Sequence, residues 1–377
     1  MWTGAQMPGT GEPIGTPWPD RRLLDLLGIA HPIVLAPMAG LGTPELAASV
    51  SNAGGLGSLG CAALRPPAIV AAISRLRALT DGPVNVNFFC HDATVADLRR
   101  EAAWRARLAP YYRELGLSSD AAASPVGLAP FGPETCEVIE QTRPEIASFH
   151  FGLPEPSLLH RVKAAGCRVL SSATTVAEAC WLEANGADAV IAQGNEAGWH
   201  RATFLDKDAA QPGTLALLPA VVDAVRVPVI AAGGIGDGRG ITAAFALGAA
   251  GVQVGTAFLL CPEAATPPSY RAALRSAGPT VVTDVFTGRP ARALANRLTR
   301  EVESFLGVPA FPLAMPALAP LRAEAERQGR TDFSAFWAGE AASLARDMPA
   351  GALTQLLAEV ALRQMNGCAS AARPLKP

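Results

Sequence analysis

The chain has 377 residues, of which 50% are hydrophobic and 17% are charged, and its formal net charge is −2. This length is ample for one large core with an appended piece. The near-neutral charge predicts no nucleic-acid partner, and no apolar run reaches the roughly 20 residues of a membrane span.

The first 27 residues are rich in Pro and Gly, and we predict a flexible tail over 1–27. Eight short apolar runs then alternate with helical patterns. This alternation predicts an α/β fold, a (β/α)8 TIM barrel, over residues 28–262. A doubly wound open sheet is the alternative, which a regular count of eight disfavours. The expected strands cover residues 33–36, 56–59, 84–88, 146–149, 168–171, 189–192, 227–232 and 252–254.

Two regions depart from this alternation. Residues from about 91 to 133 interrupt it after the third strand, and a long insert beside the mouth of a barrel is predicted to act as a lid. Residues 263–377 are mainly helical in pattern, with one clear amphipathic face at Leu353, Leu356, Leu357 and Val360. We expect this C-terminal segment to pack on the barrel.

The last two expected strands both end in glycine turns. Gly233, Gly234 and Gly236 follow the strand at 227–232, and Gly255 and Thr256 follow the strand at 252–254. Turns of this kind aim several backbone N–H groups at one point, where an anion can bind. In a (β/α)8 barrel the phosphate site commonly lies after strands seven and eight. The pattern therefore predicts a phosphate-binding site.

Other polar and glycine residues also end or follow strands, so they should meet at the same mouth of the barrel. Asn87 and Gln193 can each donate and accept hydrogen bonds, which suits the edge of a flavin ring. Residues 38–40 would give the ring a close, apolar floor. Seven cysteines without a CxxC pair indicate reduced thiols in a cytoplasmic protein, and no metal constellation is visible. The residues expected at the mouth are Met38, Ala39, Gly40, Asn87, His150, Gln193, Gly198, Gly233, Gly234, Gln253, Gly255 and Thr256.

The sequence resembles the nitronate monooxygenase family, formerly called 2-nitropropane dioxygenases. The motifs that carry the resemblance are PIVLAPMAGLGTPELAASVSNAGGLGSLG, NVNFFCH, SFHFGLP, QGNEAGWHR, AAGGIGDGRG, QVGTAFL, FTGRPARALANRL and WAGEAASLAR, and SFHFGLP points to the class I branch. The resemblance implies a (β/α)8 enzyme that binds FMN at the mouth residues above and at Val254. It also implies oxidation of alkyl nitronates, such as propionate 3-nitronate, with O2 to a carbonyl compound plus nitrite or nitrate.

The resemblance further implies that His150, in SFHFG, is the base that removes the α-proton of a neutral nitroalkane. His200 is the rival base, although the family resemblance assigns its loop to flavin binding. The chain departs from the family at Trp199, where the loop usually carries glycine. An indole there would remove φ freedom and lie near the flavin. Cys61 is expected to be a small buried hydrophobic residue.

Two other functions stay open. One is a flavin-dependent enoyl-acyl-carrier-protein reductase that uses a reduced nicotinamide. The other is a flavin-binding accessory protein without turnover. Trp199, which replaces the family's usual glycine, leaves this second alternative open. The expected partners are a small nitronate or nitroalkane and O2, with neither nucleic acid nor membrane, and the oligomeric state is undetermined.

Overall fold

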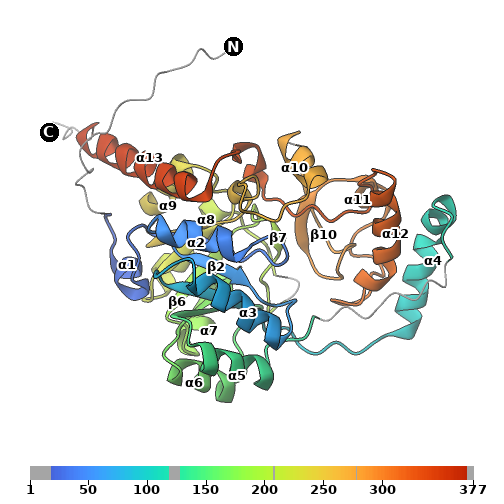
Figure 1. The fold of residues 1–377 in the computed structure, drawn as a ribbon, viewed down its shortest axis with the longest axis horizontal. Helices are drawn as coiled ribbons and strands as arrows, with labels where there is room; N and C mark the ends of the chain where they lie inside the picture. The colour runs from blue at the N-terminus through green and yellow to red at the C-terminus, as the bar shows by residue number, and fades with distance from the viewer. Residues whose placement is uncertain (1–17, 119–127, 207–208, 277, 372–377) are drawn as a thin grey trace, which may run out of the picture.

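The computed structural model in Figure 1 describes residues 18–118, 128–206, 209–276 and 278–371. Residues 1–17 of the expected tail lie outside these ranges. The tail does not extend to residue 27, because Trp18 is buried and helix α1 (Arg22–Leu27) places three leucines in the core. The LLDLL sequence of this helix gives it one apolar face, which the barrel covers.

Within the described residues, eight parallel strands form one sheet that curls into a nearly closed barrel. The neighbours run in the order β1-β9-β8-β6-β5-β4-β3-β2, and a parallel bridge between Val34 and Leu56 joins the first strand to the last. This closure confirms the (β/α)8 prediction over the open sheet. The barrel strands are β1 (Ile33–Leu35), β2 (Gly57–Gly60), β3 (Val84–Phe89), β4 (Ile146–His150), β5 (Arg168–Ala173), β6 (Ala189–Gln193), β8 (Val229–Ala232) and β9 (Gly251–Val254).

Helices between the strands cover the outside of the barrel. Most begin at a proline, which has no N–H to leave unpaired in the first turn, and α2 is also capped by the Thr43 hydroxyl. Their apolar faces pack on the continuous hydrophobic runs of the strands. The covering helices are α2 (Pro44–Asn52), α3 (Pro66–Arg77), α5 (Pro133–Thr142), α6 (Pro156–Ala164), α7 (Val176–Ala184), α8 (Thr214–Ala224) and α9 (Gly238–Ala246).

The insert and the C-terminal segment build a second core beside the barrel. Helix α4 (Leu98–Glu114) lies against α12 (Met315–Arg327), away from the barrel wall (Figure 1). Trp104 of α4 is buried there, and its indole donates to the backbone oxygen of Ala314. Thus α4 is fixed to the C-terminal segment, and the role of the insert as a lid stays a prediction.

The C-terminal segment also contains strands, which the sequence analysis did not expect. Strand β10 (Thr280–Thr283) pairs antiparallel with β11 (Ala291–Leu294), which pairs with β7 (Trp199–His200). The TVVT sequence of β10 is rich in β-branched residues, which favour strands. Through β7, this small sheet is anchored to the loop that follows barrel strand β6.

The other C-terminal helices complete the fold. Helix α13 (Ala350–Ala371) packs across α2 and α9 on the outside of the barrel (Figure 1). The remaining elements are α10 (Pro268–Arg275), α11 (Arg297–Glu301) and two short 3-10 turns, η1 (Thr256–Phe258) and η2 (Glu340–Leu344). The turns η1 and η2 touch each other at the mouth of the barrel.

Candidate active site

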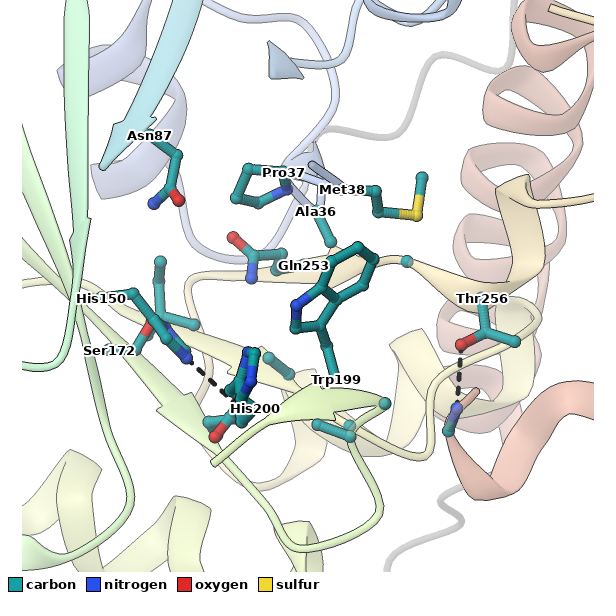
Figure 2. Close-up of a pocket in the computed structure, with 18 of the residues that line it drawn as sticks. Ala36, Pro37, Met38, Asn87, His150, Ser172, Trp199, His200, Gln253 and Thr256 are labelled. Carbon is teal, nitrogen blue, oxygen red and sulfur yellow. Dashed lines mark hydrogen bonds between the residues drawn. The ribbon is translucent and has the colours of Figure 1, made fainter. Parts of the chain in front are cut away.

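A cavity opens at the carboxyl ends of the barrel strands, where the sequence analysis placed the site (Figure 2). Gly40 and Val254 do not line it. Gly40 lies in a turn that has already left the strand end, and Val254 is buried in the core because the adjacent Gln253 faces the cavity. The predicted residues that do line it are Met38, Ala39, Asn87, His150, Gln193, Gly198, Gly233, Gly234, Gln253, Gly255 and Thr256.

The two glycine turns form one end of this cavity. Gly233 and Gly234 have φ values of 104° and 72°, which residues with a side chain rarely adopt. Among the described residues, none accepts a hydrogen bond from the backbone N–H of Gly234, Gly255 or Thr256. N–H groups without acceptors that line a cavity form a cradle for an anion.

The side-chain amides of Asn87, Gln193 and Gln253 differ in how many of their polar atoms already have hydrogen-bond partners within the protein. Both polar atoms of Gln193 are engaged, since its nitrogen donates to the His200 oxygen and its oxygen accepts from Ala202 N–H. The Asn87 nitrogen donates to Ser148. Gln253 differs from both, because its Oε1 is buried with no hydrogen-bond partner. Figure 2 shows this amide in the centre of the cavity, where a ligand could reach it.

His150 sits at the end of β4 with a defined tautomer. Its Nε2 lies 3.1 Å from the backbone oxygen of His200. A carbonyl oxygen only accepts, so Nε2 carries the proton and the lone pair of the neutral ring is on Nδ1. Burial lowers the pKa of His150 to about 3; the His200 carbonyl opposes this, while Arg289 and Arg201 lower the pKa further. His150 is therefore neutral near pH 7, which is the form that a base requires.

His200 also lines the cavity, so the structure keeps it as the rival base. Its Nε2 lies 3.0 Å from Thr287 Oγ1, and its Nδ1 is buried with no partner. Burial lowers its pKa well below the usual value, and the nearby His150 adds to this effect. Its backbone, unlike that of His150, belongs to the small sheet.

Two buried charged side chains, Arg201 and Glu178, form hydrogen bonds with the loop that carries Trp199 and His200 and with its neighbours. The Arg201 guanidinium donates to the Gln193 and Gly194 oxygens and to Gln211. The carboxylate of Glu178 accepts from Thr174 and from the backbone N–H of Phe204. In a capping box, the Glu178 carboxylate would accept a hydrogen bond from the Thr175 backbone N–H. Here it accepts from Thr174 and Phe204 instead. Both side chains thus fix the position of the loop.

Trp199 occupies a backbone conformation that favours glycine. Its φ is 69°, and its ring centroid lies 5.7 Å from that of Trp337. In Figure 2 the indole stands among Met38, Gln253 and Thr256, within the cavity. The chain therefore keeps a glycine-like backbone here while adding a large side chain to the site.

For the nitronate chemistry that the resemblance implies, we expect Trp199→Gly to widen the range of nitronates accepted and to tighten binding of the implied flavin, because it removes the indole from the cavity. Trp199→Ala is the matched control, since it also removes the indole but keeps the strain at positive φ. The free energy of unfolding of the Trp199→Gly variant should be about 1 kcal/mol higher than that of the Trp199→Ala variant. Kinetics across short and branched nitronates and thermal unfolding measure the two effects. Unchanged kinetics in both variants would show that the indole does not limit the site.

Sequence reasoning missed several residues that line the cavity. Ser172 and Ile191 come from β5 and β6, and the sequence offered no signal beyond their place at strand ends. Gly339 and Ala341 come from beyond the barrel. Gly339 N–H donates to Thr256 Oγ1, and a Cβ on Gly339 would lie 2.8 Å from the Glu196 oxygen. Only a glycine allows this close approach.

Cysteine, metal-site and membrane predictions concern other parts of the described chain. Cys61 is 1% exposed and burial raises the pKa of its thiol to about 12, so it is a small buried hydrophobic residue as expected. In the described part of the chain, no group of three His, Cys, Asp or Glu residues could hold a metal ion. Of the helices in the described ranges, none is both long and apolar enough to cross a membrane. The cytoplasmic location stays a prediction.

Fold and cavity together define the class: a (β/α)8-barrel protein with an anion cradle after its last two strands and a neutral histidine facing the same cavity. Solved structures agree with this class. Nitroalkane oxidase from Streptomyces ansochromogenes matches with a TM-score of 0.84 at 38% identity, covering 92% of this chain and 99% of that one. FabK from Thermotoga maritima matches with a TM-score of 0.69 at 30% identity, covering 93% and 98%.

The sequence comparisons identify the family. The nitronate monooxygenase family model matches residues 20–360. The chain is 45% identical to a nitronate monooxygenase of Paraburkholderia phytofirmans, over 89% of this chain and 94% of that protein. It is also 45% identical to the nitronate monooxygenase of Pseudomonas aeruginosa, over 90% and 98%. The chain belongs to the nitronate monooxygenase family.

Proposed function

We propose that this protein is an FMN-dependent nitronate monooxygenase. It would oxidise small alkyl nitronates, such as propionate 3-nitronate, with O2 to a carbonyl compound plus nitrite or nitrate. The observation that carries the proposal is that one cavity joins an anion cradle to a neutral histidine with a free Nδ1. Family membership supports the same reaction.

The residues of the cavity fit FMN. The backbone N–H groups of Gly234, Gly255 and Thr256 suit its single phosphate, since no described residue accepts from them. The buried, unpartnered Oε1 of Gln253 suits an N–H on the edge of the flavin ring. Met38 and Ala39 line the same cavity and would give an apolar contact for the ring. When bound, FMN supplies the one-electron oxidation of the nitronate, and O2 completes the reaction.

The protein's own contribution is proton transfer and positioning. His150 Nδ1 would take the α-proton of a neutral nitroalkane, while the His200 carbonyl and the Nε2 proton hold the ring in place. A pre-formed nitronate needs no such step. Two aromatic rings contact His150, with Phe89 at 5.8 Å and Phe151 at 4.6 Å between centroids.

The cofactor can be tested directly. Heat should release non-covalent FMN from the purified protein, and mass determination should identify it. FAD, or no flavin after reconstitution, would contradict the proposal.

A second measurement distinguishes the proposed monooxygenase from the nicotinamide-dependent reductase considered above. Under anaerobic conditions the visible flavin absorbance should bleach on mixing with a nitronate and stay unchanged with NADH or NADPH. Rapid bleaching by a nicotinamide would favour the reductase. Flavin that neither reductant bleaches would indicate a binding protein without turnover.

A further inference from the structure

A second cavity, of about 900 Å³, lies behind the candidate active site. The beginning of the insert, the loop after β4 and the turn that follows β10 surround it. It shares no lining residue with the first cavity. The lining residues that matter here are His91, Asp92, Arg100, Phe151, Arg201 and Arg289.

Arg289 is a largely buried cation with no carboxylate at hydrogen-bond distance. Its guanidinium stands 3.7 Å from the centre of the Phe151 ring and donates to the backbone oxygen of Thr203. Among the described residues its guanidinium has no other hydrogen-bond acceptor, and none of their salt bridges contains it. A buried guanidinium has five N–H donors, so most of its capacity is unused. A desolvated cation of this kind is stabilised by an anion from outside the chain.

His91 gives a second, independent sign of a ligand. It is 7% exposed, it lines the same cavity, and its Nδ1 has no hydrogen-bond partner. Buried polar atoms are satisfied in the great majority of cases. A ligand in the cavity would supply the missing partner.

The other charges around the cavity leave Arg289 without a neutralising contact. Glu178 and Asp92 act on Arg289 only through space, and the Glu178 carboxylate is already bonded to Thr174 and to Phe204 N–H. The Arg201 guanidinium already donates three hydrogen bonds, to Gln211 and to the backbone oxygens of Gln193 and Gly194. Arg100 lines the exposed rim. The free capacity of the lining is therefore mostly cationic.

One layer of aromatic rings separates the two cavities. The Phe151 ring contacts Arg289 on the side of the second cavity, and its centroid lies 4.6 Å from that of His150. Phe311 and Phe89 extend the same layer. A group held at Arg289 would therefore be one ring away from the candidate base.

We propose that the second cavity binds a small aliphatic carboxylate, with the Arg289 guanidinium as its counter-charge. Because the ring layer separates this cavity from the candidate active site, the carboxylate belongs to a separate small molecule and not to the substrate. Arg pairs well with carboxylates because its planar fork matches their two oxygens.

Calorimetric titration with succinate tests the cavity without any turnover. Succinate should bind the wild-type protein, and succinamide, its neutral counterpart, should not. Arg289→Gln should weaken succinate binding by about tenfold to a hundredfold. Arg289→Lys keeps the positive charge but lacks the planar guanidinium, so its affinity for succinate should fall less than that of Arg289→Gln. Arg100→Gln, at the exposed rim, is the matched control and should change the affinity little.

Kinetics give an independent control on the separation of the two sites. The ratio of kcat/KM for propionate 3-nitronate to that for propyl nitronate should be unchanged in Arg289→Gln, because the carboxylate bound at Arg289 is not part of the substrate. A fall in this ratio would contradict the separate site. If the wild-type protein oxidises neither nitronate, the proposed function fails, but the succinate titration still decides the site.

The proposal is overturned if succinate produces no heat and no rise in unfolding temperature in the wild-type protein. It is also overturned if succinate and succinamide bind equally. Thermal unfolding of each variant shows whether it is folded. If Arg289→Gln does not fold, the comparison of wild type with Arg289→Lys replaces it.

Discussion

Replacing His150 with Asn should lower kcat/KM for a neutral nitroalkane by roughly 10²–10⁴-fold, the usual contribution of a general base. The same change should affect the pre-formed nitronate of that compound much less. A nitroalkane must lose its α-proton before it can give up an electron, whereas a nitronate has already lost it. Asn keeps a polar side chain of similar reach and removes the basic Nδ1.

The measurement is kcat/KM for a matched nitroalkane and nitronate in both proteins, read as a difference in activation free energy. Equal loss on both substrates would make His150 a binding or structural residue. No loss on either would assign the proton transfer to His200, and His200→Asn is the comparison variant.

The pH dependence gives an independent check on the same residue. A base acts in its neutral form, which is present above its pKa and is lost as the pH falls through it. Because burial lowers the pKa of His150 to about 3, the His150-dependent rate should persist well below pH 6.5. An acid limb near pH 6.5 would show that water and substrate in the cavity restore an ordinary pKa.

Replacing Gly255 with Asp should abolish FMN retention while leaving the barrel folded. A carboxylate about 4 Å from a phosphate costs about 4 kcal/mol at the effective dielectric of a protein surface, which weakens binding by roughly a thousandfold. Gly255 lines the cavity beside Thr256, so the added charge would face the proposed phosphate. Flavin content after purification and circular dichroism measure the two outcomes.

Gly255→Asn is the matched control, because it has the same shape as Asp without the charge. A Cβ at this position would lie 3.1 Å from the Cβ of Ala36, so any side chain requires a small adjustment. Loss of flavin in both variants would reflect this crowding. Full flavin in Gly255→Asp would place the phosphate elsewhere.

The barrel could be predicted because its signals are local. Each strand is an apolar run that ends in a polar or glycine residue, and strand ends in a closed parallel barrel must meet at one mouth. This reasoning brought His150, Gln253 and the two glycine turns together correctly. Gly40, which follows the end of β1 by several residues, and Val254, whose side chain alternates with that of Gln253, do not line the cavity.

What the sequence could not predict depends on partners far along the chain. Strand β7 is two residues long and exists because β11 pairs with it, more than 90 residues later. The Glu178 carboxylate follows the pattern of a capping box, but Phe204 N–H offers it a partner outside the helix. No local pattern indicates that Gly339 would fit between Thr256 and the loop at Gly198.

The contact between Gly339 and Thr256 also sets an order of events during synthesis of the chain. The eight barrel strands are complete at Val254, but the cavity receives Gly339 and Ala341 only after a further stretch has been translated. A nascent chain that has just finished the barrel therefore presents an open, unfinished pocket. The ligand-binding pocket is completed late in translation, after the sheet that supports it.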